Sequence, residues 1–223
     1  MQGLMRAVIF DLDGTLVDTA GEIATALNAT LFDLGLPSLP LPRVEALIGR
    51  GVRALVERAL AELGAAHDAE DAVDRFEMHY AQVVGTQAEL YAGVLPGLEQ
   101  LQARGMPLAV VTNKPRAFTL KLLERLEVDR FFTAIVAGDD GHRRKPEGDM
   151  LTAACAAMGM PASSCLMLGD SDNDVRAARA AGCPVWCVPY GYNEGRPVES
   201  LACDRVVPSV DAAAKFLRSG LQQ

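Results

Sequence analysis

The sequence lacks the cysteine pattern of a disulfide-stabilised protein, because its five cysteines are an odd number and no Cys-x-x-Cys pair occurs. This usage is typical of reduced thiols, so we expect a cytoplasmic protein. The sequence also has no apolar run long enough to cross a bilayer, and it does not open on a charged segment followed by an apolar one. We therefore expect no membrane partner.

Positive charge is also scarce. Lysine and arginine total 21 against 29 acidic residues, which gives a formal net charge of −8. A nucleic-acid-binding surface needs clustered positive charge, so no nucleic-acid partner is expected. A small anionic metabolite is compatible with the net charge, because a local cationic pocket can outweigh a distant acidic surface. The oligomeric state stays open between a monomer and a homodimer.

Half of the 223 residues are hydrophobic, which is enough for a sizeable core. Short apolar runs predict strands at Ala7–Phe10, Leu108–Val111, Ala134–Ala137, Cys165–Leu168, Val185–Val188 and Val206-Val207. Helical patterns lie between the later strands, at Leu98–Ala103, Phe118–Leu126, Met150–Met158, Asp174–Ala181 and Asp211–Leu217. This alternation predicts an α/β fold in which helices cover both faces of a parallel sheet.

The stretch after the first strand differs, because it is helical throughout. Helices are predicted at Ala20–Leu34, Arg43–Ile48, Val52–Leu63 and Ala69–Val84, with a proline-rich loop over Leu36–Pro42. The first strand needs the later strands to bury it. We therefore predict a core domain of residues 1–17 and 90–223, interrupted by a helical domain at residues 18–89.

Two acids, Asp11 and Asp13, follow the first predicted strand, and Gly14 permits a turn there. Ligands of open parallel sheets bind at the carboxyl ends of the strands. One carboxylate at this position could attack an electrophile while the other moves a proton. On its own, the motif is read equally well as a solvated turn.

Two later strand ends carry groups that suit a phosphate. Thr112 and Asn113 follow the second strand of the core, where a hydroxyl and a backbone N–H can bind phosphate oxygens. A simple helix cap is the alternative reading of this pair. Lys145 closes a basic run after the next strand, and its compact charge suits a phosphate or a pair of carboxylates.

The segment Gly169–Asp174 carries the strongest metal signal. Asp170 and Asp174 are four residues apart, so the first turn of a helix can present both on one side. Carboxylates crowded beside Asp11 and Asp13 would repel one another, and a hard cation such as Mg²⁺ relieves that repulsion.

In this order, the motifs resemble those of the haloacid dehalogenase superfamily of phosphohydrolases. They are Asp11-Leu-Asp13-Gly-Thr15, Thr112-Asn113-Lys114, Lys145-Pro146 and Gly169-Asp170-Ser-Asp-Asn-Asp174. Within the superfamily, the chain is most similar to bacterial phosphoglycolate phosphatases, through the segments 18–28, 49–52, 180–184 and 190–193. Two departures are Arg50, where a small polar residue is expected, and Gly148, where a proline is common. The resemblance implies a Rossmann-like core and a helical cap.

The resemblance also implies roles for single residues. Asp11 would be the nucleophile that forms an aspartyl-phosphate, and Asp13 would be the general acid and base. Mg²⁺ would be held by Asp11, by the backbone carbonyl of Asp13, and by Asp170 and Asp174. The phosphoryl oxygens would be bound by Thr112, Asn113 and Lys145. The cap residues expected to read the rest of the substrate are Arg50, Gly51 and Arg53.

The implied reaction is the hydrolysis of a small phosphorylated metabolite, 2-phosphoglycolate foremost, to glycolate and phosphate. Alternatives are phosphatases for another sugar phosphate, such as N-acetylmuramic acid 6-phosphate, or for pyrophosphate. A phosphosugar mutase is disfavoured because Thr15 stands where those enzymes have valine, and no histidine lies between Ala20 and Leu34. A non-enzymatic phospho-acceptor module is disfavoured because Asp13 would hydrolyse its acyl phosphate.

Overall fold

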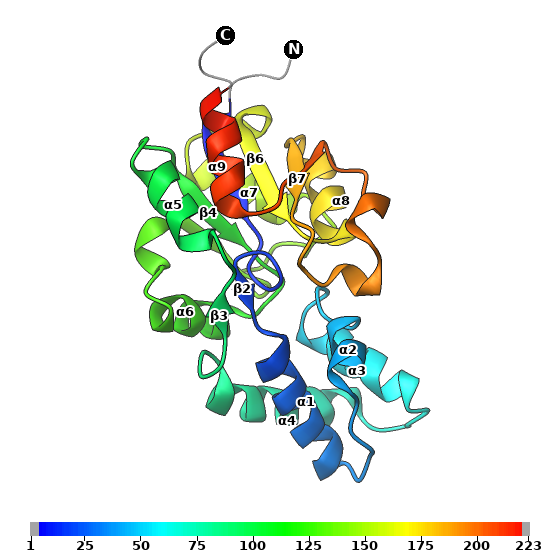
Figure 1. Ribbon diagram of the computed structural model, residues 1–223. Coiled ribbons are helices and arrows are strands. Elements are labelled where there is room, and N and C mark those ends of the chain that lie inside the picture. Colours follow the sequence, from blue (N-terminus) through cyan, green and yellow to red (C-terminus); the bar gives the residue numbers. More distant parts are fainter. Residues whose placement is uncertain (1–4, 220–223) are drawn as a thin grey trace.

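The computed structural model describes residues 5–219 and contains a parallel sheet with helices on both faces (Figure 1). In spatial order, its strands are β5 (Ala134–Val136), β4 (Leu108–Val111), β1 (Ala7–Phe10), β6 (Cys165–Gly169), β7 (Val185–Cys187) and β8 (Arg205–Val206). All neighbouring strands are paired in parallel. The predicted α/β fold is confirmed.

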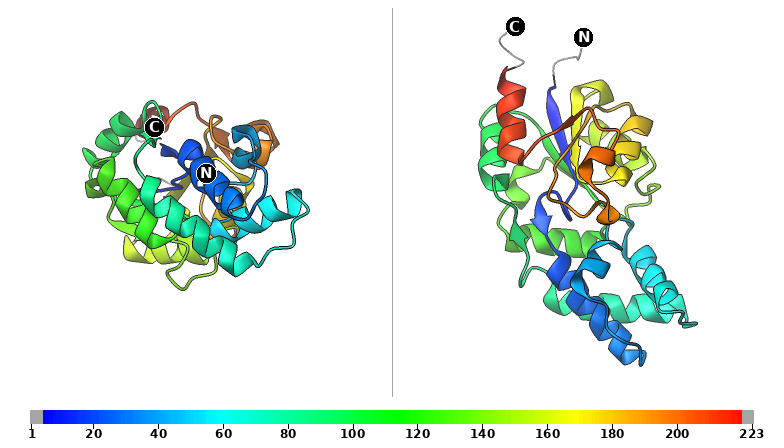
Figure 2. Two further views of the ribbon diagram at one scale, coloured as in Figure 1. Left: turned by 90° about the horizontal axis from the view of Figure 1, so that it is seen from below. Right: turned by 45° about the vertical axis from the view of Figure 1, so that its right-hand side comes forward.

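Successive residues of the central strand β1 point to opposite faces of the sheet, and each face has its own hydrophobic core. Val8 and Phe10 belong to one core, while Ala7 and Ile9 belong to the other. Figure 2 shows both layers of helices with the sheet between them. They are α5 (Val94–Gln102), α6 (Arg116–Arg125) and α9 (Val210–Ser219) on one face, and α7 (Asp149–Ala157) and α8 (Asp172–Ala181) on the other. Burial on both faces explains why β1 is an unbroken apolar run.

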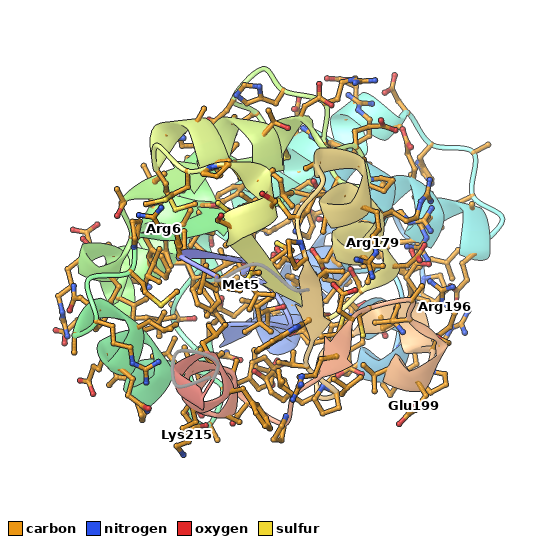
Figure 3. All side chains as sticks on the ribbon, turned by 90° about the horizontal axis from the view of Figure 1, so that it is seen from above. Met5, Arg6, Arg179, Arg196, Glu199 and Lys215 are labelled. Carbon is orange, nitrogen blue, oxygen red and sulfur yellow. The ribbon has the colours of Figure 1, made fainter. Side chains whose placement is uncertain are left out.

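The parallel register brings the carboxyl ends of the central strands to one level. Phe10 of β1 lies opposite Val110 of β4 and Leu168 of β6. The side chains that follow these strands therefore emerge at the same edge of the sheet. Figure 3 looks down on the opposite end of the molecule, where Met5 and Arg6 precede β1.

Four helices lie beyond the carboxyl edge of the sheet (Figure 1) and are called the cap below. They are α1 (Ala20–Asp33), α2 (Leu41–Glu45), α3 (Val52–Glu62) and α4 (Ala69–Val83). A two-stranded antiparallel ribbon, β2 (Val17–Asp18) and β3 (Glu89–Leu90), lies where the chain enters and leaves the cap. On the basis of this ribbon, we propose residues 18–89 as the cap domain and residues 1–17 and 90–223 as the core. Residues 1–4 and 220–223 lie outside the described part.

Helix α2 differs from the expected pattern. Leu41 and Pro42 were expected in a loop, but α2 begins at Leu41 and ends at Glu45, before the predicted end at Ile48. Pro42 is tolerated because the first turn of a helix leaves its N–H groups without intrahelical partners. The ribbon of β2 and β3 was not predicted, because two-residue strands are too short to show an alternating pattern. Among the described residues, no helix has both the length and the apolarity to span a membrane.

Candidate active site

Three buried polar residues follow the central strands. Asp11 comes after β1, Thr112 after β4 and Asp170 after β6. The Asp11 N–H donates to the Leu168 carbonyl at 3.0 Å, so the backbone of Asp11 continues the sheet ladder. The three side chains that the sequence placed at separate strand ends are thus carried by one sheet edge.

The carboxylates of Asp11, Asp170 and Asp174 form a cluster in which one oxygen of each lies within 4.8 Å of the others. Burial raises the pKa of Asp11 well above its ordinary value, and the neighbouring Asp174 and Asp170 add to this effect. Burial and Asp174 likewise raise the pKa of Asp170 to about 7. A buried set of oxygen ligands with mutual repulsion suits a hard divalent cation.

Lys145 neutralises part of this cluster. Its ammonium nitrogen lies 2.8 Å from Asp11 Oδ1 and 2.7 Å from Asp174 Oδ1. Burial lowers the pKa of Lys145, but the two carboxylates outweigh burial, so its pKa lies above the ordinary value and the side chain stays charged. The prediction that Lys145 can span two carboxylates is confirmed by this geometry.

The side chain of Asn113 fixes the backbone of Lys145. Asn113 Oδ1 accepts from the Lys145 N–H at 3.0 Å, and Asn113 Nδ2 donates to the Lys145 carbonyl at 2.9 Å. The peptide bond from Lys145 to Pro146 is cis. Asn113 Nδ2 also donates to the Gly49 carbonyl of the cap at 3.0 Å. One amide therefore links the phosphate-binding candidates of the core to the cap.

Asp174 is held in place by the start of helix α8. Its Oδ2 accepts from the N–H of Asp170 at 3.2 Å, and from the N–H and Oγ of Ser171 at 3.1 and 2.8 Å. Ser171 is the N-cap of α8, and the two residues form a capping box. Asp174 thus uses one oxygen for the helix start and the other for Lys145.

Asp170 is also fixed by several donors. Thr15 Oγ1 donates to its Oδ1 at 2.8 Å, and the Tyr192 N–H donates to its Oδ2 at 2.8 Å. Gly14, at φ +85°, leaves the room that Asp170 needs, because a Cβ at Gly14 would lie 2.6 Å from Asp170 Oδ2. The turn after Asp13 therefore requires glycine for two reasons, its backbone conformation and the close carboxylate.

Asp13 lies apart from the three-carboxylate cluster. Its carboxylate accepts from Lys114 Nζ at 2.8 and 3.0 Å and from Thr19 Oγ1 at 2.8 Å. The contribution of its backbone carbonyl to a metal site stays a prediction. Sequence reasoning assigned no role to Lys114, although it is the third residue of the quoted motif Thr112-Asn113-Lys114.

A cavity of about 50 Å³ lies between the sheet edge and the cap. Its core wall is lined by Asp11, Asp13, Thr112, Asn113 and Lys114. Its cap wall is lined by Ile23, Phe76 and Tyr80 from α1 and α4, and by residues of the segment 48–55, among them Gly51. A Cβ at Gly51 would lie 3.1 Å from the Asn113 carbonyl, so the close approach of cap and core favours glycine there.

The two cap arginines singled out by the sequence do not line this cavity. Arg50 forms a two-pronged ion pair with Glu194 of the core, and its side chain is 52% exposed. Arg53 pairs with Glu70 and Glu57. Of the three predicted cap residues, the structure brings Gly51 to the cavity.

Tyr80 was missed as a cavity residue. Tyr80 follows Phe76 by four residues on α4, which is the ordinary spacing of a buried helix face. The two rings do lie on such a face, stacked with their centroids 5.5 Å apart. An aromatic residue at this position has the same sequence pattern whether it packs in the core or lines a cavity.

Comparison with known proteins shows the family to which the chain belongs. The family model described as haloacid dehalogenase-like hydrolase matches residues 8–188. A curated phosphoglycolate phosphatase of Nitrosospira multiformis is 44% identical over 218 residues, which cover 96% of each chain. That of Escherichia coli K12 is 36% identical over 227 residues, covering 93% of this chain and 90% of the relative.

A solved structure has the same fold over almost the whole chain. The crystal structure of a predicted phosphoglycolate phosphatase from Haemophilus somnus superimposes with a TM-score of 0.90 at 30% identity. The superposition covers 97% of this chain and 99% of that one. The chain therefore belongs to the haloacid dehalogenase-like hydrolase family.

Proposed function

We propose that this protein is a Mg²⁺-dependent phosphatase that hydrolyses 2-phosphoglycolate to glycolate and phosphate. The observation that carries the proposal is the cluster of Asp11, Asp170 and Asp174 at one sheet edge, in which Lys145 is bound to Asp11 and Asp174. Relatives named phosphoglycolate phosphatase, at 36–44% identity over nine-tenths or more of this chain, support the reaction and the substrate.

Asp11 is the nucleophile of the proposed reaction. Its carboxylate oxygen attacks phosphorus, the bond from phosphorus to the ester oxygen breaks, and an aspartyl-phosphate forms. Asp13 gives its proton to the departing glycolate oxygen. Asp13 then takes a proton from a water molecule that attacks the same phosphorus, which releases phosphate and restores Asp11.

The negative charge of the transferring group is balanced by neighbouring residues. Thr112, Asn113 and Lys145 bind the phosphoryl oxygens, where charge lies in the transition state. Asp11, Asp170 and Asp174 are the side chains that would hold Mg²⁺. When bound, the ion neutralises the carboxylates and lets an anionic substrate approach an anionic nucleophile.

The cap favours a small leaving group. Its wall approaches the core closely, since a Cβ at Gly51 would lie 3.1 Å from the Asn113 carbonyl, and this close approach suits a small leaving group. The cap must open to admit substrate, and its closure excludes water from the aspartyl-phosphate. All five cysteines are free, in keeping with the cytoplasmic location that we also propose.

A substrate panel tests the proposal. Phosphate release is measured with Mg²⁺ from 2-phosphoglycolate, N-acetylmuramic acid 6-phosphate, another sugar phosphate and pyrophosphate. We expect the highest kcat/KM for 2-phosphoglycolate, loss of activity in EDTA, and recovery when Mg²⁺ is restored. A preference for another member of the panel would contradict the proposed substrate, and full activity in EDTA would contradict the metal dependence.

A further inference from the structure

The cap wall of the cavity is largely apolar. Its hydrophobic members are Ile23, Ile48, Val52, Leu55 and Phe76. A carboxylate that enters such a cavity loses water, so it needs a cation or hydrogen-bond donors to replace the lost solvation. Because the proposed substrate carries a carboxylate on its leaving group, the cavity should contain those donors.

Lys114 is the cation that can supply this charge. Arg50 and Arg53 are paired with glutamates and stand outside the cavity, and Lys145 is bound to Asp11 and Asp174. Lys114 is the one cationic side chain among the described residues that lines the cavity. An ammonium group has three donors, and Lys114 Nζ donates to the two oxygens of Asp13 and lies beside the Tyr80 side chain.

Tyr80 offers a second donor beside it. Tyr80 is 1% exposed, and its hydroxyl makes no hydrogen bond of good geometry among the described residues, although the Lys114 ammonium lies near it. Lys114 Nζ lies 4.8 Å from the centroid of the Tyr80 ring. Burial raises the pKa of Tyr80 to about 12, so the hydroxyl keeps its proton at neutral pH and can donate. An unpaired buried hydroxyl is costly, which suggests that a ligand satisfies it.

We propose that Tyr80 and Lys114 bind the carboxylate of the substrate and thereby select phosphate esters of short hydroxy acids. This inference rests on the proposed function, because Asp13 then marks the position of the leaving-group oxygen. Lys114 Nζ lies 2.8 Å from Asp13 Oδ1. In 2-phosphoglycolate, one methylene carbon separates the ester oxygen from the carboxylate, so a group that touches Asp13 is placed to meet that carboxylate.

The test uses glycolate, the free leaving group, as a probe. Its inhibition constant is measured against the Mg²⁺-dependent hydrolysis of ethyl phosphate, which has a methyl group in place of the carboxylate. The proteins compared are wild type, Tyr80→Phe and Lys114→Met, with Tyr91→Phe as the matched control. Tyr91 lies outside the cavity and packs against Tyr190, with ring centroids 4.3 Å apart.

We expect glycolate to inhibit the wild type and Tyr91→Phe equally. Tyr80→Phe keeps the aromatic ring and removes the hydroxyl, so the inhibition constant should rise about tenfold or more, the usual cost of a lost hydrogen bond to a charged group. Lys114→Met should raise it further. An unchanged inhibition constant in both variants, or no inhibition of the wild type, would overturn the inference.

The proposed function is tested separately, by the kcat/KM of the wild type for 2-phosphoglycolate. If the wild type hydrolyses 2-phosphoglycolate but Tyr80→Phe and Lys114→Met bind glycolate normally, the carboxylate site is refuted and the proposed function is kept. A wild type that binds glycolate through Tyr80 and Lys114 but prefers another phosphorylated acid would refute the substrate and keep the site.

Discussion

Lys145 Nζ lies 2.8 Å from Asp11 Oδ1, although the strands that precede the two residues, β5 and β1, are separated in the sheet by β4. The loop after β5 carries Lys145 across that strand to Asp11, the proposed nucleophile. The contact places a buried cation beside the carboxylate that we propose to attack phosphorus.

Replacing this cation should harm both activity and stability. In Lys145→Met, the charges of Asp11 and Asp174 lose their partner, so we expect kcat to fall by about 10²-fold or more. The free energy of unfolding in EDTA should fall by about 3–5 kcal/mol, as for other buried ion pairs that lose one member. Steady-state kinetics and urea unfolding measure the two effects. Lys215→Met, a change of an exposed lysine that pairs with Asp211 on α9, is the control, and wild-type kcat in Lys145→Met would contradict the role.

The metal-free protein should lose stability as the pH rises. Burial, reinforced by Asp174, raises the pKa of Asp170 to about 7 from its ordinary 3.8. Between these values the folded state binds a proton that the unfolded state has released, so the contribution of Asp170 to stability is complete at low pH and is lost on the way to about pH 7. Asp170→Asn cannot titrate.

The measurement compares urea unfolding of the wild type and Asp170→Asn in EDTA across this pH range. The stability of the wild type relative to the variant should fall with rising pH, and added Mg²⁺ should reduce the fall, because the ion favours the ionised carboxylate. Parallel stability curves in EDTA would show that Asp170 does not titrate in this range.

Replacing Arg50 should change the hydrolysis of 2-phosphoglycolate and of ethyl phosphate to the same extent. Its partner Glu194 comes from the core, so the pair joins core and cap at the surface without touching the cavity. We expect Arg50→Ala to change kcat/KM for 2-phosphoglycolate and for ethyl phosphate by the same factor, with a stability cost of about 1 kcal/mol or less. Glu194→Gln should also change both kcat/KM values by one factor, with a larger stability cost because Glu194 also pairs with Arg58 and Arg196. A loss confined to 2-phosphoglycolate would return Arg50 to substrate recognition.

Several of these residues could be predicted from the sequence. A parallel sheet aligns the ends of its strands, so acids after β1 and β6 had to meet, and Asp11 and Asp170 do. The pairing of Asp13 with Lys114 could not be predicted in the same way. It depends on the direction of two side chains 101 residues apart, which no local pattern records.

The helices of the cap were predicted from the sequence. The cap residues that face the core were not. Arg50 pairs with Glu194, a residue 144 positions away in the sequence. This long-range pairing holds Arg50 at the surface, and the sequence around Arg50 does not indicate it. Tyr80 has the periodicity of a core residue, and its unpaired hydroxyl becomes visible only when its neighbours are in place.

Glycine is required at Gly14 by the site as well as by the backbone. Gly14→Ala places a methyl group against Asp170, whereas Gly105→Ala meets nothing within 4 Å at a similar φ of +67°. Both substitutions should lower the free energy of unfolding by about 1 kcal/mol, because alanine strains the backbone at a positive φ. We expect only Gly14→Ala to weaken Mg²⁺ activation, seen as a higher Mg²⁺ concentration at half-maximal activity. Equal Mg²⁺ activation in the two variants would contradict the close packing of Gly14 on Asp170.

The most direct test of the account is the turnover of 2-phosphoglycolate by Asp11→Asn in Mg²⁺, with circular dichroism to verify the fold. An amide is a poor nucleophile, so we predict a folded protein without measurable phosphate release beside an active wild type. Phosphate release near the wild-type rate would show that Asp11 does not attack phosphorus.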